Sequence, residues 1–298
     1  MNPGDVLKLP QPENFSFREI LWFLDRRYDD CLYELFPGEV RRLVKIGSDS
    51  ALISINREGR HLVVKVLTGS VSQEQLRNYV VRWFDLDRDL GPYYQLLQNS
   101  DLGYMVGKFS GLRMVGIPDV FEALCWCIIG QQINLTFAYT IKRRFVEAYG
   151  QSLEFEDRQY HTFPSPQQLE VVSMSDLKEM QFSRQKADYI LNLAEVFRRG
   201  EVSYQSLADL EYEDQRKRLL GLRGIGEWTA NYVLMKTFGD TQSIPFGDVG
   251  LFKALENHGV ITDRKDRKKI EQFFEQFPGW GSYVTIYLWR SLSEPNLK

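Results

Sequence analysis

The sequence predicts an α+β protein, in which an N-terminal antiparallel sheet with helices precedes an all-helical region. Three runs rich in β-branched residues, at 42–47, 50–55 and 61–67, are separated by short turns and read as strands. Apolar residues at helical spacing over 17–27 predict a helix that packs on this sheet. From Ser72 onward the pattern is helical almost throughout.

The chain of 298 residues, 43% of them hydrophobic, is long enough for two or three packed domains. We expect a sheet domain over residues 1–75 and a helical region over residues 76–298, in which 76–115 and the C-terminal helices can form one subdomain. Asp119, with Glu122 three positions later, predicts a capping box at the start of a long apolar helix.

The net charge of −3 counts against nucleic-acid binding as a bulk property, but it does not exclude a local basic surface. Basic clusters at 142–144, 184–186, 216–218 and 264–269 can equally be solvated helix faces. The odd number of cysteines predicts no disulfide framework, and the scattered histidines predict no structural zinc site. Without a signal peptide or an apolar run of membrane-spanning length, we expect a cytoplasmic protein.

Residues 213–238 are predicted to form two helices joined by a glycine-rich hairpin. The first helix ends near Leu220, the turn spans 221–226, and the second helix spans 227–238. Glycine allows positive φ and close approach of the backbone, and free N–H groups at a helix start bind phosphate favourably. The turn therefore predicts DNA binding, although a plain turn between two helices also needs glycine. The expected DNA contacts are Gly224, Ile225 and Gly226.

The pattern Leu-x-Gly-Leu-Arg-Gly-Ile-Gly at 219–226 resembles the hairpin of the helix-hairpin-helix DNA glycosylases, with the bacterial 3-methyladenine glycosylase II group as the nearest match. Residues 244–251 resemble the segment that carries the catalytic aspartate of that superfamily. The resemblance is specific from about 119 to 290 and weaker over the N-terminal sheet, which in this family is half of a TATA-binding-protein-like fold. It implies no catalytic cofactor, but it implies a sodium or potassium ion on the backbone carbonyls of Leu220, Leu222 and Ile225.

Asp248 lies in the loop 240–250, directly before a predicted helix at 249–257, and on this ground alone it is an N-cap. The resemblance implies that it is also the catalytic carboxylate. Because backbone N–H groups and the helix dipole favour the ionised form, we expect a low pKa. Cleavage of an N-glycosidic bond builds positive charge on the sugar, which a fixed carboxylate stabilises while it orients a water.

Trp228 indicates the subtype. In bifunctional members of the superfamily, a lysine at the second position after the last hairpin glycine forms a Schiff base. The tryptophan here has no amine, so we expect a monofunctional enzyme.

The resemblance further implies an aromatic base pocket, which we expect to contain no lysine. A purine alkylated on a ring nitrogen carries positive charge, and aromatic faces attract cations. Core packing is the alternative for Tyr232, and we assign Phe252 and Tyr283 to the core. The expected pocket residues are Trp228, Tyr232, Trp289, Phe23 and Arg27.

In this superfamily the residue after a Gly-Gln pair fills the gap that the flipped nucleotide leaves. Here Gln132 follows Gly130 and Gln131, whereas the bacterial relative has an apolar wedge. Glutamine can hydrogen-bond to the orphaned base but excludes water less well. A second departure is Val249, where that relative has an aromatic residue.

The expected function is hydrolysis of the N-glycosidic bond of alkylated purines, such as 3-methyladenine and 7-methylguanine, in duplex DNA by a monomeric enzyme. An oxidised-purine glycosylase of the same superfamily is one alternative. A non-catalytic DNA-binding module of a repair complex and a purely structural helical domain are the others.

Overall fold

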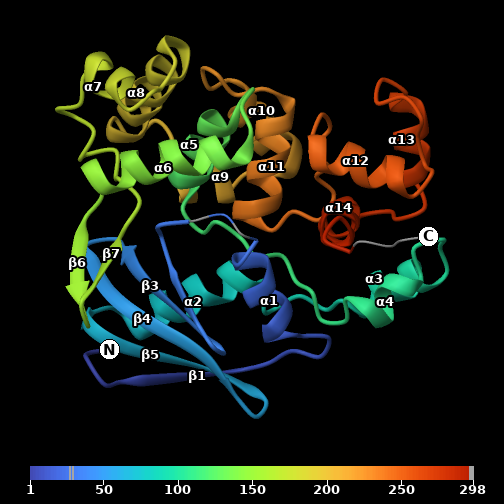
Figure 1. Cartoon of the computed structure of the whole chain (residues 1–298), viewed down its shortest axis with the longest axis horizontal. Coiled ribbons are helices and arrows are strands. Elements are labelled where there is room, and N and C mark those ends of the chain that lie inside the picture. The colour runs from blue at the N-terminus through green and yellow to red at the C-terminus, as the bar shows by residue number, and fades with distance from the viewer. Residues whose placement is uncertain (27, 29, 295–298) are drawn as a thin grey trace.

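A computed structural model of the chain describes residues 1–26, 28 and 30–294, and it consists of a sheet layer with helical groups beside it (Figure 1). The strands are β1 (Val6–Pro10), β2 (Glu34–Phe36), β3 (Glu39–Ile46), β4 (Asp49–Glu58), β5 (His61–Ser70), β6 (Ser152–Phe155) and β7 (Arg158–His161). The helices are α1 (Phe17–Leu24), α2 (Gln73–Phe84), α3 (Gly91–Gln98), α4 (Tyr104–Lys108), α5 (Val120–Gly130), α6 (Leu135–Tyr149), α7 (Met174–Glu179), α8 (Arg184–Arg198), α9 (Tyr204–Ala208), α10 (Tyr212–Leu220), α11 (Glu227–Phe238), α12 (Val249–Asn257), α13 (Arg267–Phe274) and α14 (Gly281–Ser291).

The N-terminal sheet has five antiparallel strands in the order β1-β5-β4-β3-β2. The three runs that the sequence predicts as strands lie in β3, β4 and β5, and Gly47 and Gly59 make the turns between them with positive φ. The two edge strands were not predicted, because β1 has only five residues and ends in proline while β2 has only three.

Helices α1 and α2 cover the sheet and share its hydrophobic core. Phe17 and Ile20 of α1 are buried there with Trp83 of α2. Helix α1 ends at Leu24, three residues earlier than predicted, and the predicted domain boundary at residue 75 falls inside α2.

Strands β6 and β7 form a separate hairpin, which the sequence analysis did not predict. Its turn consists of Glu156 and Asp157, both at positive φ, so the sequence carries none of the glycine or asparagine that usually marks such a turn. Tyr160 of β7 is buried against Leu43 and Leu52 and so fixes the hairpin to the large sheet.

The helices form two further hydrophobic cores. One core joins α3 and α4 to α12, α13 and α14. The other contains α5, α6, α8 and much of α11. Met235 of α11 belongs to the core that joins α3 and α4 to α12, α13 and α14. Helix α11 therefore runs between these two helical cores. No helix in the described part of the chain is long and apolar enough to cross a membrane.

Asp119 caps α5, accepting a hydrogen bond from the Glu122 N–H at 3.0 Å, as predicted. The predicted capping box is incomplete, because the Glu122 carboxylate bonds instead to the guanidinium of Arg42 on β3, at 2.8 Å. Both side chains are buried, so this ion pair ties the sheet to the helical region.

Candidate active site

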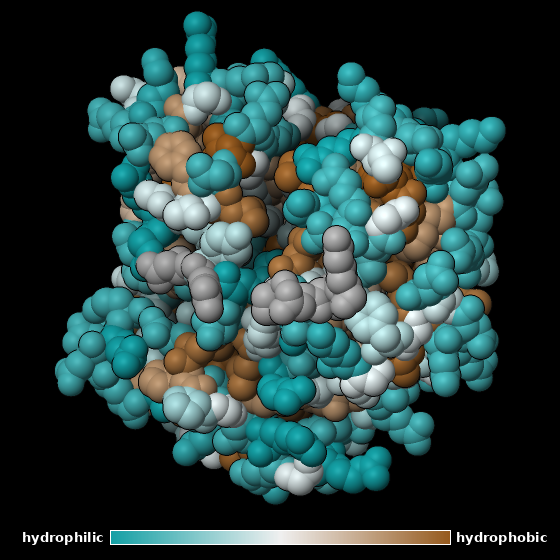
Figure 2. Space-filling view, turned by 45° about the vertical axis from the view of Figure 1, so that its right-hand side comes forward, coloured by the Kyte–Doolittle hydropathy of each residue, from teal (hydrophilic) through white to brown (hydrophobic). Residues whose placement is uncertain are grey.

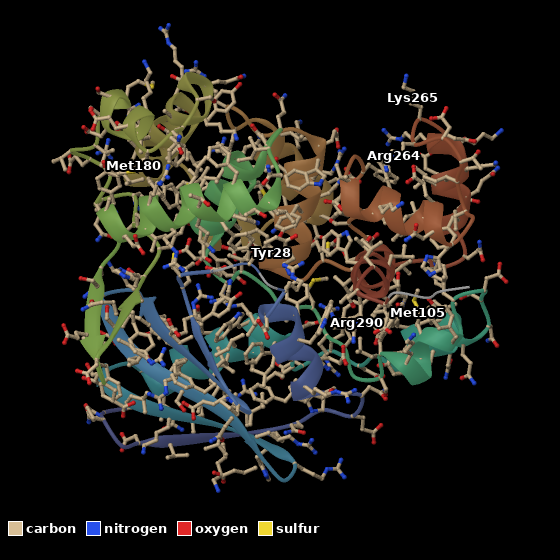
Figure 3. All side chains as sticks on the ribbon, in the orientation of Figure 1. Tyr28, Met105, Met180, Arg264, Lys265 and Arg290 are labelled. Carbon is tan, nitrogen blue, oxygen red and sulfur yellow. The ribbon has the colours of Figure 1, made fainter. Side chains whose placement is uncertain are left out.

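A cavity of about 1320 Å³ opens between the sheet with α1 and the helical groups. Its walls include the segment after α1, the end of α5, one face of α11, the start of α12 and the end of α14. In the space-filling view the surface is largely hydrophilic, and hydrophobic side chains gather in the central hollow (Figure 2). Tyr28 and Arg290 mark the place of this cavity between the sheet and the helices (Figure 3).

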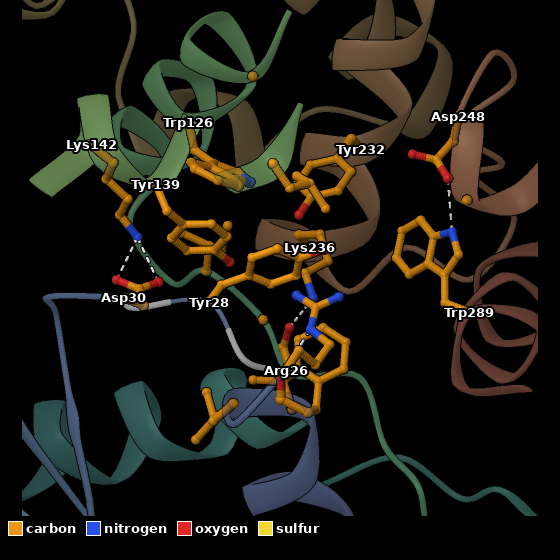
Figure 4. A pocket seen from close by; sticks show the side chains of 18 of the residues that line it. Arg26, Tyr28, Asp30, Trp126, Tyr139, Lys142, Tyr232, Lys236, Asp248 and Trp289 are labelled. Carbon is orange, nitrogen blue, oxygen red and sulfur yellow. Dashed lines mark hydrogen bonds and ion pairs between the residues drawn. The ribbon is translucent and has the colours of Figure 1, made fainter. Parts of the chain in front are cut away.

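Asp248 lies in the cavity wall as the N-cap of α12, which spans the predicted residues. Its Oδ1 accepts hydrogen bonds from the backbone N–H of Leu251 at 2.7 Å and from Nε1 of Trp289 at 2.9 Å (Figure 4). The carboxylate is therefore held by its own helix and by a side chain of α14.

The expectation of a low pKa for Asp248 is wrong. Burial raises the pKa of this carboxyl above the ordinary aspartate value, and hydrogen bonds from Leu251 and Trp289 lower it by less. The carboxylate thus costs more to ionise than an exposed aspartate. It is also a better proton acceptor.

The aromatic residues predicted for the base pocket lie together. Trp228 and Tyr232, one turn apart on α11, have ring centroids 5.3 Å apart, and Trp289 is 6.4 Å from Tyr232. Phe23 lines the same cavity, while Arg27 lies outside the described residues. Nε1 of Trp228 is buried without a hydrogen bond of ordinary geometry among the described residues, but it faces Asp248 closely enough to lower the pKa of that carboxyl.

The expectation of a cavity without lysine is also wrong, because Lys236 and Lys142 both line it. Lys236 is one helical turn beyond Tyr232 on the same face of α11, and it is only 4% exposed. Its Nζ donates to the Val115 carbonyl and lies 4.4 Å from the centre of the Phe23 ring. Burial lowers its pKa well below that of an ordinary lysine. The i, i+4, i+8 spacing of Trp228, Tyr232 and Lys236 is the signal that could have found it.

The cavity wall also contains buried ion pairs that the sequence did not reveal. Arg42 pairs with Glu122, and Lys142 pairs with Asp30 at 2.8 Å. The basic cluster at 142–144 is thus not wholly a solvated face, because its first member is buried. We also find Arg26, which sequence reasoning passed over, with its guanidinium 4.0 Å from the centre of the Phe23 ring.

The hairpin has the predicted form, with α10 ending at Leu220 and α11 spanning the predicted residues. Gly224 has φ +85°, and a Cβ there would lie 2.4 Å from the Tyr189 ring, so both backbone and packing require glycine. Gly226 faces open space and caps α11 without a side-chain hydrogen bond, which leaves N–H groups at the helix start available. A phosphate can approach this backbone closely.

The hairpin carbonyls are suitable in kind for a monovalent cation. Those of Leu220 and Ile225 accept no hydrogen bond within the described part of the chain, whereas that of Leu222 accepts one from Ile225 N–H at 3.1 Å. Uncommitted carbonyl oxygens are ligands that hard cations favour. Of the described residues, no group of His, Cys, Asp and Glu side chains could hold a metal ion.

Gln132 is exposed on the loop after α5, with φ +57°, and lies at the edge of the cavity. Nε2 of its neighbour Gln131 donates to the Gly224 carbonyl at 3.0 Å, so this loop is bonded to the hairpin. Two exposed apolar side chains, Leu135 at 45% and Val249 at 68%, lie on the same rim.

The comparisons with known proteins agree with this geometry. Residues 125–278 match the family model of the HhH-GPD superfamily base excision DNA repair protein, and residues 39–124 match that of the 8-oxoguanine DNA glycosylase N-terminal domain. A DNA-3-methyladenine glycosylase of Bacillus subtilis is 36% identical over 296 residues, covering 97% of this chain and 98% of the relative. DNA-3-methyladenine glycosylase 2 of Escherichia coli is 27% identical, covering 86% and 83%.

Among solved structures, the 3-methyladenine DNA-glycosylase of Archaeoglobus fulgidus superposes with a TM-score of 0.84 at 20% identity, covering 98% of this chain and all of that one. Sheet and helical region thus recur together in the same fold. The chain belongs to the HhH-GPD superfamily of base excision DNA repair proteins. Within it, the chain is a DNA glycosylase.

Proposed function

We propose that this enzyme is a monofunctional glycosylase that hydrolyses the N-glycosidic bond of alkylated purines in duplex DNA. The observation that carries the proposal is the place of Asp248, a half-buried carboxylate held beside Trp289 in an aromatic cavity. The names of the Bacillus subtilis and Escherichia coli relatives, both DNA-3-methyladenine glycosylases, support the class of lesion.

In the proposed reaction, the hairpin backbone binds a phosphate beside the lesion and the flipped purine enters the aromatic cavity. The electron pair of the N-glycosidic bond leaves with the purine, which an alkylated ring accepts readily. Asp248 stabilises the positive sugar that results. Water then adds to the sugar carbon and gives its proton to this carboxylate, for which a raised pKa is an advantage.

The test is release of free base from methylated duplex DNA by the wild type and by Asp248→Asn. Asparagine is as good an N-cap as aspartate, so the helix is retained while the charge is lost. We expect release by the variant to fall at least ~100-fold, as for loss of one preorganised electrostatic group. Its thermal unfolding temperature should be unchanged or higher, because the burial cost of the charge is removed. Equal release by both proteins would remove Asp248 from the mechanism.

An oxidised-purine glycosylase is the second candidate, because residues 39–124 match the 8-oxoguanine DNA glycosylase N-terminal domain. A bifunctional enzyme of that kind needs an amine, but Trp228 stands at the second position after Gly226. Borohydride reduction in the presence of 8-oxoguanine DNA separates the two proposals. A trapped covalent adduct supports the second candidate, whereas no adduct on this DNA together with free base from methylated DNA supports the first.

We further propose that the carbonyls of Leu220, Leu222 and Ile225 hold a sodium or potassium ion that would strengthen phosphate binding. Gln132 is the proposed plug for the vacated stack, and Gly224, Ile225 and Gly226 are the proposed backbone contacts to DNA. We also propose that the enzyme acts as a monomer, since one copy of the chain supplies the carboxylate, the aromatic cavity and the hairpin.

A further inference from the structure

The cations of the cavity wall fall into two groups. Five line the cavity within the described residues: Arg26, Arg42, Lys142, Lys236 and Arg290. Three of them have a carboxylate partner, since Arg42 pairs with Glu122, Lys142 with Asp30 and Arg290 with Glu19, at 2.7 to 2.8 Å. The described chain places no carboxylate within ion-pair distance of Arg26 or Lys236.

Arg26 keeps most of its hydrogen-bonding capacity. Its Nε donates to the Phe23 carbonyl at 3.0 Å, and the structure gives its terminal nitrogens no partner among the described residues. A guanidinium has five N–H donors in a fixed planar arrangement, so four of them remain. Packing over the Phe23 ring holds the group in place, where it acts electrostatically on Tyr232, Tyr139 and Lys236.

Lys236 is the second basic residue without a carboxylate partner among the described residues. One of its hydrogens goes to the Val115 carbonyl, and the aliphatic stem and amine are otherwise enclosed. Burial, and after it the neighbouring guanidinium of Arg26, lower the pKa of Lys236, and in either protonation state the amine keeps an N–H beyond the one that bonds to Val115. Figure 4 shows Arg26 reaching toward Lys236 and Tyr232, with Asp248 and Trp289 on the other side of the cavity.

We propose that Arg26 and Lys236 form a donor edge in the base pocket that selects purines with an oxygen at position 6 over purines with an amino group there. The 6-oxygen and N7 of hypoxanthine are both acceptors, and 7-methylguanine retains the 6-oxygen. Adenine derivatives present donor hydrogens at position 6, which face the donors of Arg26 unfavourably. The inference rests on the proposed function, because it assumes that a flipped purine occupies this cavity.

The experiment measures free 7-methylguanine and free 3-methyladenine released in the same reaction from one methylated duplex DNA. Both bases are cationic in the nucleotide, so a change in their ratio between wild type and variant does not arise from the charge of the ring. The ratio does not depend on the active fraction of the preparation, so a poorly folding variant still gives a result. Wild type, Arg26→Met, Arg26→Gln and Lys236→Met are compared with Arg60→Met.

Arg60 is the matched control, because it is an exposed arginine in the turn between β4 and β5 and does not line the cavity. We expect Arg26→Met to lower the ratio of 7-methylguanine to 3-methyladenine about ten-fold or more, as for the loss of a charged hydrogen bond. Arg26→Gln, which keeps an N–H donor, should fall between wild type and Arg26→Met. Lys236→Met should change the ratio in the same direction, and Arg60→Met should leave it unchanged.

An unchanged ratio in Arg26→Met, with both bases still released by the wild type, overturns this inference and leaves the proposed function intact. An equal fall in both bases overturns it as well, because it assigns Arg26 to the sugar-phosphate backbone. A wild-type enzyme that releases neither base overturns the proposed function and this inference together.

Discussion

The hydrogen bond from Trp289 to Asp248 allows the pKa of the carboxyl group to be changed while Asp248 itself is kept. Replacing Trp289 by phenylalanine keeps an aromatic ring in the cavity, but it removes the Nε1 donor, which lies 2.9 Å from Oδ1, together with one ring of the indole. That donor lowers the pKa of Asp248, so its loss adds to the increase that burial already causes. The hydrogen bond from Leu251 remains and still caps the helix.

The size of the effect follows from the charge on the acceptor. A hydrogen bond to a charged group contributes about 1.5–3 kcal/mol. Since about 1.4 kcal/mol corresponds to one pKa unit, the pKa of Asp248 should rise by about 1–2 in Trp289→Phe. In the proposed reaction the ionised form is the active one, so activity should be lost as pH falls through this pKa, and the acid limb should move to higher pH by that amount.

The assay is single-turnover base release across pH 4 to ~10, with enzyme in excess over DNA but below its Kd for that DNA, because the free-enzyme pKa then sets the acid limb. Trp280→Phe is the control, because it is the same substitution at a tryptophan that lies directly before α14 and does not line the cavity. Trp289→Phe should approach wild-type rates at high pH and fall behind below neutrality. A deficit of the same size at every pH, or an acid limb that does not move, would refute the electrostatic role of the indole N–H.

Three further outcomes test the packing around the site. Glu122→Leu leaves Arg42 buried without its partner and should lower the free energy of unfolding, measured in urea, by about 3–5 kcal/mol. Changing both residues to leucine should recover most of this loss. A double variant as unstable as the single one contradicts this expectation. Gly224→Ala, strained at φ +85°, should have a free energy of unfolding at least ~1 kcal/mol lower than wild type. Gly226→Ala should keep wild-type stability and lose DNA affinity. A destabilised Gly226→Ala beside a stable Gly224→Ala would contradict these roles of the hairpin glycines. Lys236→Met should be more stable than wild type at pH values between the lowered pKa of this amine and the ordinary lysine pKa of about 10.5, because wild-type folding must release a proton there. This advantage should vanish as the pH rises toward 10.5. A difference in stability that stays constant across this range contradicts the lowered pKa.

Much of the fold was predictable because local patterns agree with the tertiary structure. The strands in the middle of the sheet have the β-branched runs that predict them, and α11 and α12 have the predicted bounds, with glycine or aspartate at their caps. The β6–β7 hairpin was missed because Glu156 and Asp157 make its turn without glycine. What holds it is Tyr160, whose burial depends on contacts far away in the sequence.

The placement of Asp248 and of the aromatic face of α11 in one cavity wall was predictable, because identity and spacing carry that information. The pKa of Asp248 was predicted in the wrong direction, because a sequence indicates a helix cap but not how deeply the carboxylate is buried. Arg26 and Lys236 were missed for a related reason. Their significance lies in the absence of a carboxylate partner among the residues that the structure describes, which only the three-dimensional arrangement reveals.

The ion pair between β3 and α5 has a consequence for how such an enzyme can change. Because Arg42 and Glu122 join the sheet to the helices at the cavity, the N-terminal half supplies part of the chamber that we propose receives the base. Phe23 and Arg26 come from that half, while the hairpin and Asp248 come from the other. Substitutions in the half that contains neither the phosphate-binding turn nor the carboxylate can therefore redirect which lesion is accepted and leave the bond-breaking apparatus untouched.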